Sequence, residues 1–196
     1  MLAHIRPALV STVLFTLLLG VAYPLAITGI GQLAFPFQAG GSLLRAGGGE
    51  VIGSALIAQG FSRPEYLHPR PSAAGKGYDA SASSGSNYGP LNEDLIKRVK
   101  ADAVALRADT GQTRVPDDAV TTSGSGLDPD ISPAYALLQA DRIAKARGVS
   151  PDLMRKEIAA QVDGPLLGFL GQPRVNVLKA NLALDGAFAK GLPKAR

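Results

Sequence analysis

The sequence predicts an α+β protein with one N-terminal transmembrane helix followed by a single mixed, helix-rich extracytoplasmic domain. The first observation is that no charged side chain occurs from Pro7 to Leu44, and residues 8–33 are apolar almost throughout. About 20 apolar helical residues cross a bilayer core of roughly 30 Å, so this stretch is long enough to span. The second observation is that helix start signals recur after residue 90, between segments rich in Gly, Pro and Ser.

Charge and composition divide the chain into segments. We expect residues 1–7 to be a short cytoplasmic N-terminus, 8–33 the transmembrane helix, 34–50 a linker and 51–190 the extracytoplasmic domain. Before the span the chain carries only the α-amine, Arg6 and His4, and positive charge tends to stay in the cytoplasm. The sequence therefore predicts a single-pass protein of the inner (plasma) membrane, with its domain in the periplasm or outside the cell.

A cleaved signal peptide is the alternative to a membrane anchor. The apolar core of a signal peptide is usually about 7–15 residues long, and the stretch here is about twice that length. No A-x-A cleavage site follows residues 14–19, which also favours the anchor. Pro24 lies inside the span and should kink it or mark its outer half. Small residues would allow close packing against another membrane helix, namely Gly20, Gly29 and Gly31.

The segment after the span begins with turn signals. Gly40-Gly41 and Gly47-Gly48-Gly49 are typical of flexible connections between membrane and domain. Residues 51–61, VIGSALIAQGF, predict a buried strand or a short apolar element. Residues 63–90 are rich in Ser, Gly, Ala and Pro without a helical or strand period, which predicts a long loop. Long loops inside compact domains are usually functional or disordered.

Three helices are predicted from their caps and their apolar spacing. Asn92 can cap the first helix, whose apolar residues recur every three to four positions before Gly111. A second loop covers residues 115–132. Ser-Pro pairs then begin two helices, which we place at residues 132–147, ended by a glycine, and 150–162.

The end of the chain is less regular. Residues 174–185, RVNVLKANLALD, alternate partly between apolar and polar side chains, which favours a strand. Their Leu and Ala content favours a helix, and the residues alone do not decide between the two. The tail from Gly191 is expected to be frayed.

The composition excludes several classes of function. The chain has no cysteine, which removes disulfides, thiolate metal sites and cysteine nucleophiles. It has two histidines, of which only His68 lies in the domain, so multi-histidine metal sites are excluded and we predict no metal site. The 20 basic and 16 acidic residues nearly balance and form no basic block, so we expect no nucleic-acid partner.

Catalysis would need a nucleophile and a base. A membrane-anchored extracytoplasmic hydrolase that uses His68 with Ser72, Ser123 or Ser125 is the alternative function that the residues leave open. No G-x-S-x-G elbow, P-loop or D-K-T-G run accompanies these residues. We therefore predict no catalytic residue.

Two features of the second loop suggest binding. Ser123, Gly124, Ser125 and Gly126 form an SGSG run that could present backbone N–H groups to an anion, although a short Gly-Ser motif is more often a turn. The acidic side chains of this loop could favour cations near an ion entrance or could be ordinary solvated turn residues: Asp117, Asp118, Asp128 and Asp130.

Taken in order, these segments form a specific series. The run comprises GSALIAQGF (53–61), RPEYLHPRPSA (63–73), SGSNYGPLN (84–92), VPDDAVTTSGSGLDPDISP (115–133), then Gln139, Arg142, Ala146, Arg147 and Gly148, and LGFLGQPRVNVLKANLALD (167–185). The series closely resembles the C subunit of the Kdp potassium-transporting ATPase of bacteria, the KdpC family, from the span to Asp185. Thr122, Asp130 and Gln172 differ from the residues that are usual in the family at these positions, but they break none of the motifs.

The resemblance implies a role in a complex. It implies a non-catalytic accessory subunit of a high-affinity ATP-driven potassium uptake system, needed for assembly or stabilisation. The implied partners are a potassium-conducting subunit, a P-type ATPase subunit and membrane lipid. The chain would have no cofactor of its own, and ATP would be available to it only through the complex.

One family proposal for the mechanism is a catalytic chaperone that raises the ATPase subunit's affinity for ATP through nucleotide contact at residues 123–126. The predicted topology places that run outside the cell, where ATP is scarce, and so favours a domain that braces the outer face of the ion-conducting subunit.

Overall fold

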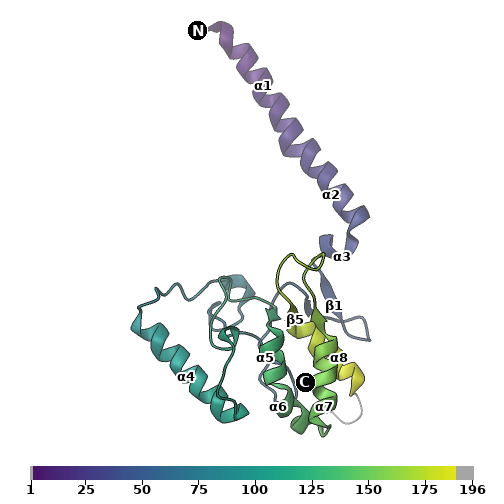
Figure 1. The fold of residues 1–196 in the computed structure, drawn as a ribbon. Helices are drawn as coiled ribbons and strands as arrows, with labels where there is room; N and C mark the ends of the chain where they lie inside the picture. Colours follow the sequence, from purple (N-terminus) through teal and green to yellow (C-terminus); the bar gives the residue numbers. More distant parts are fainter. Residues whose placement is uncertain (1, 189–196) are drawn as a thin grey trace. The chain divides into compact units, whose positions relative to one another are not determined.

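The computed structural model describes residues 2–188 and separates into two compact units, one ending at Ser54 and one beginning at Ala55. After a short turn, η1 (Leu2–His4), the first unit forms one long helix, drawn in purple in Figure 1. It consists of α1 (Ile5–Leu17), a π-helical segment η2 (Leu18–Ala22) and α2 (Tyr23–Ala34). The predicted apolar N-terminal helix is confirmed, because its 30 residues are long and apolar enough to cross a membrane and are not buried within the chain.

The disturbance predicted at Pro24 takes the form of a widened turn. Pro24 lies in the first turn of α2, directly after the π-helical segment, and the Tyr23 N–H bonds Leu18 O, five residues back. Proline cannot donate to the preceding turn, and its ring crowds the carbonyl four residues earlier. A π-helical turn relieves that crowding by giving the backbone one extra residue.

A small hairpin follows the long helix. After α3 (Pro36–Ala39), strands β1 (Leu43–Arg45) and β2 (Val51–Ser54) pair antiparallel, with Leu43 opposite Ser54. Of the glycines predicted as a flexible connection, Gly47 to Gly49 lie in the hairpin turn, where Gly49 has φ +85° and donates to Ala46 O at 2.8 Å. Gly40 and Gly41 lie in the turn that ends α3. The strand predicted after residue 50 is present, but β2 is exposed to half-buried rather than buried.

The second unit carries five helices among its described residues. They are α4 (Glu93–Thr110), α5 (Pro133–Leu138), α6 (Ala140–Arg147), α7 (Pro151–Ala160) and α8 (Val177–Ala187). The predicted caps are confirmed: Asn92 accepts from two N–H groups of α4, Ser132 from Tyr135 N and Ser150 from Leu153 N. Figure 1 shows α5 to α8 gathered beside β5, with α4 to one side.

Two elements differ from the sequence-based prediction. The helix predicted over residues 132–147 is divided at Gln139 into α5 and α6. The ambiguous segment is a strand and then a helix: β5 (Arg174–Asn176) leads directly into α8, and Asn176 caps it by accepting from Lys179 N. The strand pattern and the helix pattern in this segment therefore each correspond to an element, and the two elements follow one another along the chain.

A three-stranded antiparallel sheet supports the core. Its order is β3 (Asp130–Ile131), β5 and β4 (Val162–Asp163), with Ile131 and Val162 paired to Val175. Ile131 and Val175 are buried in one cluster with apolar side chains of α5 to α8 and of the long loop, including Leu67, Ile143, Met154, Ile158 and Leu184. The α+β class with helix predominating is confirmed.

The two predicted loops are confirmed as irregular backbone. Residues 63–90 contain only the turn η3 (Ala80–Ala82), and residues 115–132 contain η4 (Asp117–Ala119) and the two-residue strand β3. The tail from Gly191, predicted to be frayed, lies outside the described residues.

Candidate functional site

The first part of the long loop is held by two buried amide side chains. Asn181 of α8 accepts from Leu67 N at 2.7 Å and donates to Leu67 O at 3.0 Å. Gln139, between α5 and α6, does the same for His68, at 2.8 and 3.1 Å. Each amide satisfies both backbone groups of one residue, as a neighbouring strand would. The loop is therefore fixed although it belongs to no sheet.

Two arginines of α6 continue this arrangement along the loop. Arg142 donates to Pro64 O at 2.6 Å and to Tyr66 O at 3.1 Å. Arg147, whose side chain is 1% exposed, donates to Glu65 O at 2.8 Å and pairs with Asp185 at 2.8 Å. A guanidinium has five donors in one plane, so a single side chain can hold several carbonyls and a carboxylate at once.

The SGSG run meets the long loop at Gly126. Ser72 Oγ donates to Gly126 O at 2.6 Å and accepts from Ala74 N and Tyr78 N at 3.1 and 2.8 Å. Gly126 has φ +68°, and a Cβ there would lie 2.5 Å from Ser84 O and 2.7 Å from Ala74 N. Only glycine fits, because any side chain would be both strained and in collision with backbone.

A second serine-glycine run packs against the first. Ser84 N and Ser83 Oγ both donate to Ser125 O at 2.9 Å. A Cβ at Gly85 would lie 3.0 Å from Gly124 O. The motifs at residues 63–73, 84–92 and 115–133, which are distant in sequence, thus form one junction of loops.

The predicted nucleotide contact at residues 123–126 lies within this junction. Gly124 and Ser125 are exposed, whereas Gly126 is buried. Ser125 Oγ accepts from Leu127 N, and the Ser123 hydroxyl lies 3.4 Å from the Ser125 hydroxyl. Arg70, which binds the same loop, pairs with Asp128 at 3.1 Å. The visible role of the run is to join loops, and nucleotide contact there stays a prediction.

The serine and histidine of the alternative hydrolase are engaged elsewhere. His68 Nε2 lies 3.1 Å from Arg63 O, and the Ser72 hydroxyl donates to Gly126 O. Burial, and secondarily the charge of Arg142, lowers the pKa of His68. Within residues 2–188 no hydrogen bond joins the His68 ring to Ser72, Ser123 or Ser125, so the structure assembles no nucleophile and base from them.

The acidic residues of the second loop are mostly committed to holding it. Asp118 accepts from Ser132 N at 2.6 Å and from its hydroxyl at 2.9 Å. Asp130 pairs with Arg174 at 3.2 Å and accepts from Asn176 at 2.9 Å, and burial raises its pKa. These side chains line a groove of about 550 Å³, but among residues 2–188 no cluster has three or more groups able to hold a metal ion.

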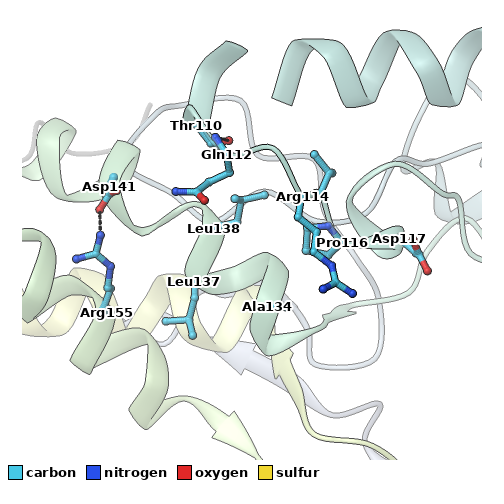
Figure 2. Close-up of a pocket in the computed structure, with 11 residues that line it drawn as sticks. Thr110, Gln112, Arg114, Pro116, Asp117, Ala134, Leu137, Leu138, Asp141 and Arg155 are labelled. Carbon is cyan, nitrogen blue, oxygen red and sulfur yellow. Dashed lines mark hydrogen bonds and ion pairs between the residues drawn. The ribbon is translucent and has the colours of Figure 1, made fainter. Parts of the chain in front are cut away.

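A second cavity, which the sequence did not indicate, has a volume of about 560 Å³ (Figure 2). It lies between the end of α4, the segment after it, and α5 to α7. Figure 2 shows Arg155 joined to Asp141 on one wall, at 2.5 Å, with Leu137 and Leu138 between that pair and Arg114. Arg155 also pairs with Asp152 at 3.0 Å, so one guanidinium is shared between two carboxylates.

Sequence reasoning named Gln139, Arg142 and Arg147 only as parts of a motif, and it missed Asn181. The available signal for Asn181 was a single amide within the apolar run of α8, where a polar side chain needs a partner. The contact with Leu67 itself joins residues 114 positions apart and has no local signal.

Together the fold and site define a protein that has, within residues 2–188, one candidate membrane span and a small domain whose polar motif residues fix loops rather than assemble a reaction centre. A family model described as KdpC, the c chain of the K+-transporting ATPase, matches residues 5–186. The chain belongs to this family, and it is a non-catalytic subunit of the Kdp potassium-transporting ATPase complex.

Relatives with the same description cover nearly the whole chain. The potassium-transporting ATPase KdpC subunit of Caulobacter sp. strain K31 is 65% identical over 188 residues, which is 96% of both chains. That of Beijerinckia indica is 60% identical over 190 residues, again 96% of both. That of Rhodopseudomonas palustris strain CGA009 is 50% identical over 199 residues, which covers 95% of this chain and 98% of the relative.

Proposed function

We propose that this subunit assembles and stabilises the complex by joining its potassium-conducting and P-type ATPase subunits, and that it takes no chemical part in turnover. The observation that carries the proposal is the way that side chains of the helices hold the first part of the long loop. The hydrogen bonds of three side chains go to the protein's own backbone: those of Gln139, Asn181 and Arg147. This arrangement gives a rigid surface rather than a reactive group. A rigid surface suits a bracing subunit because little conformational entropy is lost when it docks.

The membrane arrangement is part of the same proposal. Residues 8–33 span the membrane, residues 1–7 lie in the cytoplasm, residues 34–50 form a linker, and the domain from residue 51 to about 190 lies outside. Arg6 before the span supports this orientation, because positive charge is retained on the cytoplasmic side. Added protease should digest the domain in intact spheroplasts. Protection until lysis would place the domain inside the cell.

The orientation in the membrane decides whether the domain can contact cytoplasmic ATP directly. With the domain outside, any effect on the ATP affinity of the complex acts through the partner subunits, and the chain has no cofactor of its own. Direct nucleotide contact at Ser123 to Gly126 requires the opposite topology. The protease experiment therefore separates a bracing subunit from a direct catalytic chaperone.

Assembly is tested by gentle detergent extraction of a tagged chain expressed with its partners. We expect Gln139→Ala to lower the yield of the three-subunit complex while the complex that does form keeps wild-type ATPase activity per molecule. Lys97→Ala, on the exposed face of α4, is the control and should change neither quantity. A full yield of complex with reduced ATPase activity would overturn the proposal, since it would assign the domain a part in turnover.

A further inference from the structure

Residues 164–173, GPLLGFLGQP, form a hairpin between β4 and β5, which we call the apolar hairpin. Leu166 and Leu170 exchange both backbone hydrogen bonds at 2.9 Å, and Phe169 N donates to Leu166 O at 3.3 Å. Three residues, 167–169, lie between this pair, and the first two, Leu167 and Gly168, have φ +56° and +82°. They are the central residues of the β-turn that the Phe169 N–H closes, and two positive φ values of this kind favour Asn-Gly.

The tip carries two separate energetic costs. Leu166, Leu167 and Phe169 are 70%, 76% and 74% exposed, and Leu170 is 49% exposed. In addition, Leu167 holds a left-handed backbone conformation that a branched side chain rarely adopts. An exposed apolar cluster on a strained, ordered turn indicates that another apolar surface covers it in the working protein.

The chemistry of the hairpin favours lipid over a protein surface. No charged side chain occurs from residue 164 to 173, and the tip has no side-chain hydrogen-bonding group. Protein interfaces typically combine apolar contacts with about one hydrogen bond per 100–200 Å², often from Tyr, Trp or Arg. Leucine and phenylalanine alone match the boundary between headgroups and acyl chains, where amphipathic segments bury their apolar side chains.

The chain also keeps the domain close to a bilayer. Because Leu43 pairs with Ser54, the backbone returns at Ser54 to a point about nine residues beyond the end of the span, a reach of roughly 30 Å at most. The domain follows directly at Ala55. This short tether gives any apolar tip on the domain a high local concentration of lipid.

We propose that the apolar hairpin inserts its tip, Leu166 to Leu170, into the membrane interface as a second membrane contact of the domain. Together with the span, this contact fixes the orientation of the domain on the bilayer. The inference rests on the span as an anchor and holds for either topology, so it can fail independently of the proposed assembly role.

The absence of cysteine allows a direct test on the full chain. Leu167→Cys and Phe169→Cys are each labelled with an environment-sensitive fluorophore, and the chain is reconstituted into phosphatidylcholine–phosphatidylglycerol vesicles. Lys97→Cys on α4 is the matched control, because the Lys97 side chain is 72% exposed. We expect a blue shift, loss of quenching by aqueous iodide and strong quenching by doxyl-labelled lipid at both hairpin positions, with none of these at the control.

The opposite patterns overturn the proposal. Iodide quenching at the hairpin equal to that at Lys97→Cys would mean that the tip stays in water. The same measurements on the assembled complex detect a protein contact: if the hairpin is shielded from iodide only when the partner subunits are present, and doxyl lipid does not quench it, a partner covers the tip instead. Using two hairpin positions guards against a variant that perturbs its own turn.

Discussion

Replacing Asn181 with alanine should unfold the domain far more easily than an equivalent change at an exposed site. Asn181 is 2% exposed and bonds both backbone groups of Leu67, which is itself fully buried. Asn181→Ala leaves a buried N–H and a buried C=O unpaired, at a cost of about 1–3 kcal/mol each. We therefore expect the free energy of unfolding to fall by about 2–6 kcal/mol, a large share of the roughly 5–15 kcal/mol that holds a typical domain.

The assay is urea unfolding of the full chain in mild detergent, followed by far-UV circular dichroism. The helix of the span should persist in detergent, so the signal change reports the domain. Asn92→Ala is the matched control, because Asn92 also accepts two backbone N–H groups, but at an exposed helix start. Its expected cost is about 1 kcal/mol. Equal losses for the two variants would refute the reasoning, because burial would then have no effect on the cost of losing the amide.

Further predictions concern the loop junction and its titration. Gly126→Ala should destabilise the domain by at least about 1–2 kcal/mol from the left-handed backbone alone, with the collision at Ser84 O in addition; wild-type stability in thermal melting would contradict this. The lowered pKa of His68 means that the unfolded chain takes up its proton first. Stability should therefore be complete above about pH 6.5 and decline as the pH falls below it, and His68→Gln should flatten that part of the profile; identical profiles would refute the assignment. Ser123→Ala removes only a long contact to the Ser125 hydroxyl, so the KM of the complex for ATP should not change. An increased KM would instead support nucleotide contact at this run.

The sequence predicted those features whose physical cause is local. Asn92, Ser132 and Ser150 could be identified as caps because a cap acts on N–H groups two or three residues away. The strand-to-helix change at Asn176 carried the same kind of signal, an amide directly before an apolar run, but the competing periodicities around it concealed the boundary. The interruption at Gln139 has no local cause, since its side chain binds a backbone 71 residues away.

The sequence identified the motifs of the candidate site but did not show that they meet in space. The order of the serine- and glycine-rich runs is visible in the sequence, whereas their meeting depends on the tertiary fold. Gly126 illustrates the difference. Its residue type suggested a turn, but its necessity comes from Ser84 O and Ala74 N, which lie in another loop.

The amide contact between Asn181 and Leu67 also sets an order for folding. It joins the beginning of the domain to its last described helix, 114 residues later. Contacts of such long sequence separation form late, because the loop-closure entropy must be lost before the contact contributes. During synthesis the span and residues 63–74 leave the ribosome well before α8 exists. Residues 63–74 therefore remain without their contacts to α8 until the end of the chain has been synthesised. A nascent subunit truncated before α8 would expose this loop to the cell's proteases.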